Sequence, residues 1–229
     1  MIKVILWDID GTLLNFDAAE SYAIRKCFEI FGMGVCTDEM IAHYSVINRT
    51  YWERLERGEI SKQEVLVGRY REFFATEGLP VENAEAFNTE YQLRLGDYAF
   101  FYDNAYELVK KLKTKVKQYA VTNGTLVAQE RKLEKSELNQ LLDGVFISDV
   151  LGVEKPNVGF FTKVFEAIGD YEKDEVLIVG DSLTSDIQGG NHAGIRCCWY
   201  NPKQLKDTGN RRIDYEIRDL WEVEKIIEE

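Results

Sequence analysis

The sequence predicts an α/β fold: a doubly wound, mainly parallel sheet of the Rossmann-like kind, with an all-helical cap domain inserted after the first strand. Two observations support this prediction. Nearly continuous apolar runs, typical of strands buried on both faces of a parallel sheet, alternate with helical patterns in the second half of the chain. Between residues 16 and 95 the strand signal disappears and helical patterns replace it.

Five apolar runs are the expected strands. The first is KVILWD (residues 3–8), and the other four lie much later, at residues 117–123, 144–148, 175–181 and 196–200. Helical patterns such as NAYELVKKLK and FFTKVFEAIG separate the later runs. Alternation of this kind predicts parallel strands with helices packed on the sheet.

The inserted segment contains four expected helices, at residues 17–32, 38–58, 61–78 and 84–95. Ser61 followed by Glu64 is a capping-box pattern, which marks the start of the third helix. We therefore expect an α/β core domain made of residues 1–15 and 96–229, which carries the catalytic site, and a helical cap domain made of residues 16–95.

Charge and composition limit the partners. The chain has 28 Lys and Arg against 40 Asp and Glu, a net charge of −12, which argues against binding to a nucleic acid polymer. The first apolar run is short and reaches an aspartate, and no run has the roughly 20 apolar residues of a membrane span. Four cysteines without a C-x-x-C pair and only two histidines indicate reduced thiols and no zinc site. We expect a cytoplasmic protein.

Polar residues follow the expected strands at the points where they end. Asp8 and Asp10 follow the first strand, and later ends supply Thr122, Asn123, Lys155, Asp181 and Asp186. Because the carboxyl ends of parallel strands meet at one edge of a sheet, we expect these side chains to converge. Two carboxylates at about 4 Å repel by roughly 4 kcal/mol at an effective dielectric constant of 20, so the acids require a cation. Oxygen ligands of this kind favour Mg²⁺.

The chemistry expected of this set is phosphoryl transfer. Lys155 beside a metal ion makes a site for a phosphate dianion, with Thr122 and Asn123 as further phosphate-binding residues. Asp8 is the candidate nucleophile, which would form an aspartyl-phosphate that water hydrolyses. Asp10 lies two residues on, on the same face of an extended chain, and is the candidate for proton transfer.

These motifs resemble those of the haloacid dehalogenase-like superfamily of hydrolases. The matching segments are DIDGT (8–12), VTNG (121–124), EKP (154–156) and GDSLTSDI (180–187). The resemblance implies that Mg²⁺ is held by Asp8, the backbone carbonyl of Asp10 and Asp181, with Asp186 supporting the metal shell. It also implies that the helical insert is a cap domain. An acid at position 10 favours phosphate chemistry over dehalogenation.

The segments at 13–24 and 44–71 resemble the pyrimidine-type 5′-nucleotidases, which implies a nucleoside 5′-monophosphate as the substrate. Asn48 or Arg49 would then meet the base or sugar, and Trp52 or Tyr51 would stack on a ring. The alternative is that Trp52 belongs to the packing face of its helix.

Other functions stay open at this stage. A sugar-phosphate phosphatase or a phosphosugar mutase would share the same motifs. A non-catalytic phospho-switch module of the receiver type also pairs acids with Thr and Lys on a doubly wound sheet, but an acid at the end of the first strand followed by an insert of about 80 residues argues against it. The expected partner is a small phosphorylated metabolite, and the sequence leaves the oligomeric state open.

Overall fold

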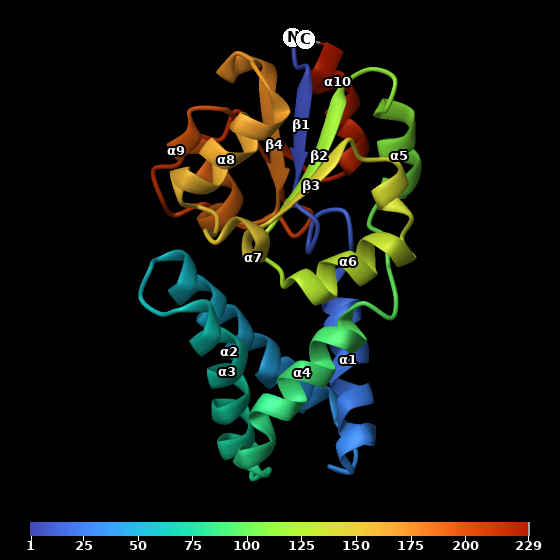
Figure 1. Ribbon diagram of the computed structural model, residues 1–229, viewed down its shortest axis with the longest axis vertical. Coiled ribbons are helices and arrows are strands. Elements are labelled where there is room, and N and C mark those ends of the chain that lie inside the picture. The colour runs from blue at the N-terminus through green and yellow to red at the C-terminus, as the bar shows by residue number, and fades with distance from the viewer. Residues whose placement is uncertain (229) are drawn as a thin grey trace. The chain divides into compact units, whose positions relative to one another are not determined.

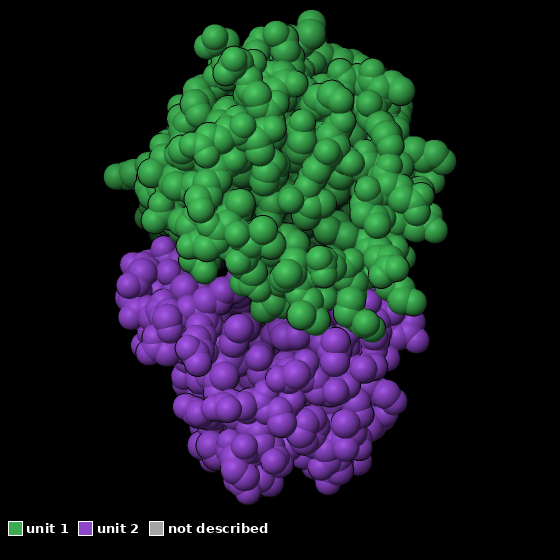
Figure 2. Space-filling model, viewed as in Figure 1, with its two compact units in different colours: residues 1–16, 99–229 green, residues 17–98 purple. Residues whose placement is uncertain are grey.

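A computed structural model of the protein describes residues 1–228, and the chain divides into two compact units (Figures 1 and 2). The core unit consists of Met1–Phe16 together with Ala99–Glu229, and the helical unit is Asp17–Tyr98. That the helical unit acts as a cap remains a prediction.

The core unit contains a six-stranded sheet in the order β3-β2-β1-β4-β5-β6, in which every neighbouring pair is parallel. The strands are β1 (Val4–Trp7), β2 (Lys117–Thr122), β3 (Gly144–Ile147), β4 (Val176–Gly180), β5 (Arg196–Tyr200) and β6 (Tyr215–Ile217). The predicted doubly wound parallel sheet is confirmed. The sequence did not predict β6, because this edge strand has three residues and no continuous apolar run.

The first strand occupies the centre of this sheet. β1 pairs with β2 on one side and with β4 on the other, so the order of the strands reverses there. In open α/β sheets, ligands bind beyond the carboxyl ends of the strands at such a switch point. The topology therefore places the end of β1 where a site is expected.

Helices cover both faces of the sheet (Figure 1). Ile5 and Trp7 pack in one hydrophobic cluster with α5 (Ala105–Leu112) and α10 (Val223–Glu228). Val4 and Leu6 pack in a second cluster with α8 (Val158–Ile168) and α9 (Gln188–Ala193). Alternate residues of β1 thus face opposite sides, and all four are fully buried. The core unit also contains α6 (Leu126–Lys135), α7 (Ser148–Leu151), the π-helical turn η4 (Leu183–Ile187) and the short 3₁₀ turns η2 (Leu138–Gln140), η3 (Lys173–Glu175) and η5 (Leu220–Glu222). A further 3₁₀ turn, η1 (Val81–Asn83), lies in the helical unit.

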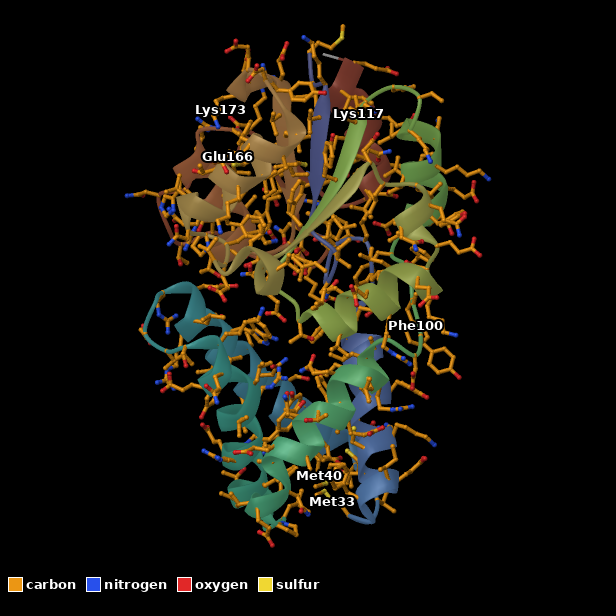
Figure 3. The ribbon with its side chains drawn as sticks, viewed as in Figure 1. Met33, Met40, Phe100, Lys117, Glu166 and Lys173 are labelled. Carbon is orange, nitrogen blue, oxygen red and sulfur yellow. The ribbon has the colours of Figure 1, made fainter. Side chains whose placement is uncertain are left out.

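The segments of the core unit that lead out to the insert and back lie side by side. Leu14 and Phe101 form an antiparallel bridge, and the N–H of Asn15 donates to the carbonyl of Phe100 at 2.7 Å. Phe100, labelled in Figure 3, is 40% exposed, so its backbone rather than its ring fixes the segment. Backbone hydrogen bonds thus join the two segments of the core unit that lead to and from the insert.

The helical unit is built from α1 (Phe16–Phe31), α2 (Asp38–Glu56), α3 (Lys62–Glu77) and α4 (Ala84–Leu95). All four predicted helices are present. The capping box forms as expected: the Ser61 hydroxyl accepts from the N–H of Glu64, and the Glu64 carboxylate accepts from the N–H of Ser61 at 2.8 Å. Seven fully buried rings fill the interior: Phe28, Tyr44, Tyr70, Phe73, Phe74, Phe87 and Tyr91.

Within residues 1–228, none of the helices combines the length and the apolar character needed to cross a membrane.

Candidate active site

Asp8 stands at the carboxyl end of β1. Its N–H donates to the carbonyl of Val179 at 2.9 Å, which extends the pairing with β4 by one residue, and the side chain is buried. The chain then turns at Gly11, which has φ +96°. A Cβ at Gly11 would lie 2.6 Å from a carboxylate oxygen of Asp181, so glycine is needed for both the turn and the close approach of the two segments.

Lys155 joins two acids in the interior. Its Nζ donates to Oδ1 of Asp8 at 2.9 Å, to Oδ1 of Asp186 at 2.6 Å and to the carbonyl of Val121 at 2.8 Å. All three protons of the ammonium group are thereby used, and the side chain is 1% exposed. A charged lysine is stable at this depth only because it is paired and hydrogen-bonded.

Burial and the neighbouring charges shift the pKa values of Asp8 and Lys155 in different ways. Burial raises the pKa of Asp8, to about 7, while the charge of Lys155 lowers it and that of Asp186 raises it. Burial lowers the pKa of Lys155, but the charges of Asp186 and Asp8 outweigh this effect and raise the pKa above its usual value. Lys155 therefore stays charged, and Asp8 needs a further cation nearby to be fully ionised at neutral pH.

A cluster of three carboxylates fits a metal ion. Asp8, Asp181 and Asp186 each offer an oxygen, and these three atoms lie within 4.8 Å of one another. One lysine cannot balance three negative charges, and oxygen donors are the ligands that Mg²⁺ prefers. The residues present thus fit the predicted Mg²⁺, with Asp181 exposed and Asp186 buried.

The fourth strand fixes Asp186 and Asp181. A second oxygen of Asp186 accepts from the N–H of Ser182 at 3.1 Å, in the turn that leads from β4 into η4. A Cβ at Gly180 would lie 2.2 Å from that oxygen, so the turn requires glycine. The indole of Trp199 on β5 donates to the carbonyl of Asp181 at 2.9 Å.

Thr12 links the two acidic segments of the site, a contact that was not predicted from the sequence. Its hydroxyl donates to Oδ2 of Asp8 at 3.1 Å and accepts from the N–H of Asp181 at 3.1 Å. The side chain is fully buried and links the ends of β1 and β4. The available signal was its place in the motif DIDGT (8–12), directly after the two acids and Gly11.

Thr122 and Asn123 end β2. Thr122 is buried, and its hydroxyl oxygen accepts from the N–H of Gly124 at 3.1 Å. The amide of Asn123 pairs with the main chain of Lys155: Oδ1 accepts from the N–H and Nδ2 donates to the carbonyl, both at 2.8 Å. The side chain of Asn123 thus fixes the segment that presents Lys155.

Asp10 lies outside the three-acid cluster. Two residues of α6 contact its carboxylate: Nε2 of Gln129 donates to Oδ2 at 2.6 Å, and Nζ of Lys132 lies 2.5 Å from Oδ1. Neither contact was predicted from the sequence. The only signal was their spacing, which places two polar residues on the buried face of an amphipathic helix.

Three of the predicted substrate residues on α2, Asn48, Arg49 and Trp52, have different surroundings. Asn48 is buried, donates to Glu20 at 2.8 Å and accepts from Arg69 at 2.6 Å. Arg49 is exposed and Trp52 is half-buried. Asn48 is therefore part of the interior of the helical unit, whereas Arg49 and Trp52 keep accessible surface.

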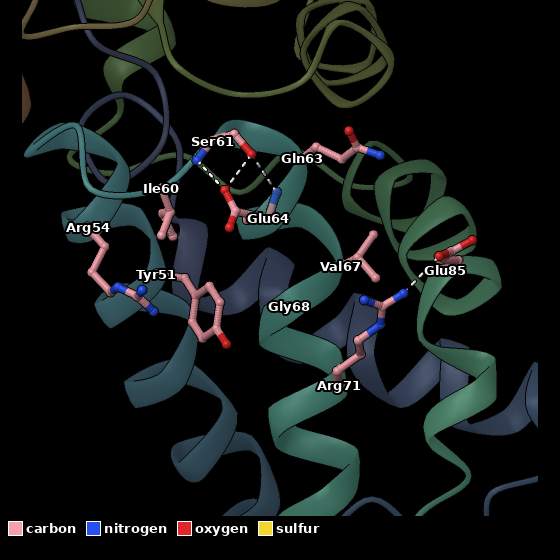
Figure 4. Close-up of a pocket in the computed structure, with 10 residues that line it drawn as sticks. All are labelled: Tyr51, Arg54, Ile60, Ser61, Gln63, Glu64, Val67, Gly68, Arg71 and Glu85. Atoms are coloured by element: carbon pink, nitrogen blue, oxygen red, sulfur yellow. Dashed lines mark hydrogen bonds and ion pairs between the residues drawn. The ribbon is translucent and has the colours of Figure 1, made fainter.

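A pocket of about 380 Å³ lies within the helical unit (Figure 4). Within its lining, Gly68 lets the ring of Tyr51 pack closely against α3, since a Cβ there would lie 2.7 Å from that ring. Its cations have acidic partners, as in the 3.0 Å pair of Arg71 with Glu85. The described lining is Tyr51, Arg54, Ile60, Ser61, Gln63, Glu64, Val67, Gly68, Arg71 and Glu85. It therefore contains the stacking candidate Tyr51 but not Asn48, Arg49 or Trp52.

The sequence profile of the haloacid dehalogenase-like hydrolases matches residues 2–194. The chain belongs to this family of hydrolases. The predicted resemblance is confirmed, and the acids at the ends of β1 and β4 lie inside the matched region.

One relative of this haloacid dehalogenase-like hydrolase is the HAD-hydrolase YfnB of Bacillus subtilis. It is 34% identical over 225 residues, which cover 98% of this chain and 95% of YfnB. A crystal structure of YfnB bound to magnesium matches with a TM-score of 0.93 over 99% of this chain and 98% of that one.

Two further relatives of the hydrolase carry a named activity. The pyrimidine 5′-nucleotidase PynA of Streptococcus pneumoniae is 36% identical over 217 residues, 94% of this chain and 90% of PynA. The pyrimidine 5′-nucleotidase YjjG of Escherichia coli is 27% identical over 97% of this chain and 96% of its own.

Proposed function

We propose that this hydrolase is a magnesium-dependent phosphatase that hydrolyses a small phosphate monoester, a nucleoside 5′-monophosphate, through an aspartyl-phosphate. The observation that carries the proposal is the group at the end of β1, where Lys155 joins Asp8 to Asp186 and Asp181 completes a three-acid cluster. A hydrolase with a buried carboxylate, a lysine and a metal-binding cluster has the parts needed for phosphoryl transfer.

In this proposal Asp8, the backbone carbonyl of Asp10 and Asp181 hold Mg²⁺, and Asp186 supports the shell. The bound ion would neutralise charge on the phosphoryl oxygens. The bond from Lys155 to Asp186 keeps that acid turned toward the cluster. The magnesium-bound structure of YfnB supports the choice of metal.

Asp8 would attack phosphorus through a carboxylate oxygen while the bond to the leaving oxygen breaks. Asp10 would give its proton to that oxygen and then take a proton from the water that hydrolyses the aspartyl-phosphate. Thr122 and Lys155 would bind the phosphoryl oxygens, with Lys155 exchanging one of its present carboxylate contacts for the phosphate. Asn123 would act by fixing the main chain of Lys155.

The named activities of PynA and YjjG support a pyrimidine nucleoside 5′-monophosphate as the substrate, because both relatives align over nearly the whole chain. Arg49 and Trp52 are the candidates for contacts with the base or sugar. The side-chain nitrogen of Asn48 donates to Glu20 and its oxygen accepts from Arg69, so Asn48 enters the proposal through that network.

A sugar phosphate is the alternative substrate. The glyceraldehyde 3-phosphate phosphatase of Pyrococcus furiosus is 30% identical over 111 residues, but these cover only 47% of this chain. A phosphosugar mutase would use the same acids and would return the phosphoryl group to a sugar instead of to water.

A phosphate-release screen with Mg²⁺ tests the proposal. Nucleoside 5′-monophosphates should give the highest kcat/KM, with pyrimidine bases preferred over purine bases. A preference for sugar phosphates would replace the nucleotidase assignment with the alternative. Turnover of a sugar phosphate without release of inorganic phosphate would indicate a mutase, and no release from any monoester would contradict phosphatase activity.

A further inference from the structure

Two side chains of α6 contact the carboxylate of Asp10, one at each oxygen. Lys132 is paired with Oδ1 at 2.5 Å, and Gln129 donates to Oδ2 at 2.6 Å. Residues three apart on a helix lie on the same face, so a single helix supplies both donors. The carboxylate is thus fixed at both of its oxygens from one direction.

Both donors lie in the interior of the core unit. Gln129 is fully buried, and Lys132 is 1% exposed. A lysine at this depth costs free energy unless it is paired, and its partner here is an acid that keeps about a fifth of its side-chain surface exposed. A leucine or methionine at position 132 would fill the same face of α6 without that cost.

The surroundings are shaped around these two side chains. A Cβ at Gly124 would lie 2.1 Å from Nε2 of Gln129, so the glycine after Asn123 makes room for the amide. Nζ of Lys132 lies 5.3 Å from the centre of the Phe16 ring, which limits the directions open to the ammonium group. Oε1 of Gln129 is buried and has no hydrogen-bond partner among the described residues, so the amide is held there by its bond to Asp10.

We propose that Gln129 and Lys132 are positioning residues for the reaction: they hold the carboxyl group of Asp10 in the orientation in which it exchanges a proton with the leaving oxygen. The inference rests on the proposed function, in which Asp10 performs this transfer. Proton transfer requires the carboxyl group within hydrogen-bond reach of the leaving oxygen, so a carboxyl group that rotates freely spends less time in the productive position.

The contacts of Gln129 and Lys132 with Asp10 should affect the rate most where the leaving group needs a proton. An alkyl phosphate, such as a nucleoside 5′-monophosphate, releases a strongly basic alkoxide unless it is protonated. 4-Nitrophenyl phosphate releases a weakly basic phenolate that needs little help. Loss of a residue that acts through Asp10 therefore reduces kcat more for the alkyl ester than for the aryl ester.

The test uses Lys132→Met and Gln129→Leu, with Lys135→Met as the matched control, because Lys135 lies on the same helix and is exposed. The alkyl phosphate is the one that is turned over best in the screen. We expect kcat for this ester to fall about tenfold or more in the first two variants, part of the total contribution of acid–base catalysis, with a smaller loss for 4-nitrophenyl phosphate and little change in KM. Lys135→Met should behave as the wild type, and Lys132→Arg should recover part of the loss.

A double-mutant cycle with Asp10→Asn completes the test. Lys132→Met should add no loss in the Asp10→Asn background. Equal losses for the two esters, or a full additional loss in that background, would overturn the inference while the phosphatase stands. A wild type that releases no phosphate from either ester would overturn the proposed function, and the inference with it. If urea unfolding shows that Lys132→Met does not fold, Gln129→Leu and Lys132→Arg decide by the same criteria.

Discussion

At the scale of single residues, the site depends on one buried lysine. Lys155 donates to Asp8, Asp186 and a backbone carbonyl, so it holds two acids that would otherwise repel each other. The positive charge of Lys155 neutralises part of the negative charge of the acidic cluster. The remaining negative charge is available to bind a metal ion. Each acid can therefore be assigned its own test.

Asp8→Asn should abolish turnover of an aryl phosphate. The amide keeps the size of the side chain but cannot serve as the attacking carboxylate, and loss of a nucleophile reduces kcat by at least about a thousandfold. Circular dichroism should show a folded protein. Turnover near the wild-type level in a folded Asp8→Asn variant would contradict the assignment of Asp8 as nucleophile.

The affinity for Mg²⁺ should depend on pH. Burial raises the pKa of Asp8 to about 7, so without metal this carboxyl holds a proton below about pH 7, and a metal ion must displace it. We expect affinity to fall by up to about tenfold per pH unit below about pH 7 and to level off above it. Calorimetric titration at several pH values measures this, with Asp8→Asn as the variant in which this proton is absent. A constant affinity for Mg²⁺ across the pH range would contradict the displacement of a proton from Asp8 by the metal ion.

At the scale of elements, a buried polar network ties the four helices of the helical unit together. Glu20 on α1 accepts from Asn48 on α2, which accepts from Arg69 on α3, which donates to Asn88 on α4. Arg69 is 1% exposed and stacks against Tyr70 and Tyr91. Arg69 thus links α3 directly to α2 and α4, and it is linked to α1 through Asn48.

Arg69→Met should strongly destabilise the helical unit. The substitution leaves Glu20 buried without the favourable positive charge of Arg69, and breaking a buried ionic network of this kind costs about 3–5 kcal/mol. Arg71→Met is the matched control on the same helix. Its ion pair with Glu85 is exposed, so that substitution should cost less than about 1 kcal/mol. Urea unfolding measures both, and similar losses in the two variants would show that the network contributes little.

At the scale of the whole molecule, the site gathers residues from distant parts of the chain. Asp8 follows β1, Lys155 lies between β3 and α8, and Asp181 follows β4. These segments meet because the parallel sheet places their carboxyl ends at one edge. A metal bound to Asp8, Asp181 and Asp186 would join the ends of β1 and β4 and should stabilise the core unit as a whole.

Mg²⁺ should raise the free energy of unfolding, by about 2.7 kcal/mol at a concentration one hundred times its Kd. EDTA should abolish phosphate release, and added Mg²⁺ should restore it. Asp181→Asn should reduce both the stabilisation by Mg²⁺ and the activity that added Mg²⁺ restores, because it removes an exposed carboxylate of the cluster. Full activity in EDTA, or equal stabilisation of Asp181→Asn, would contradict a metal site at this position.

The sequence predicted the strands and helices well because their signals are local. The apolar run of β1 and the capping box at Ser61 each depend on a few neighbouring residues. β6 was missed because its pairing with β5 is a tertiary contact of a short, partly exposed segment. The contacts of Thr12, Gln129 and Lys132 were missed for the same reason: their partners are set by folding rather than by the neighbouring sequence.

The sequence by itself determined the fold class, the family and the acids at the strand ends, because strand periodicity and short motifs can be recognised without knowledge of distant contacts. Only the tertiary structure decided how those acids are paired. It joined Lys155 to Asp8 and Asp186, engaged Asp10 through α6, and buried Asn48 against Glu20 and Arg69. The physical reason is that hydrogen bonds and ion pairs between residues far apart in sequence depend on the packing of whole elements, which no local pattern encodes.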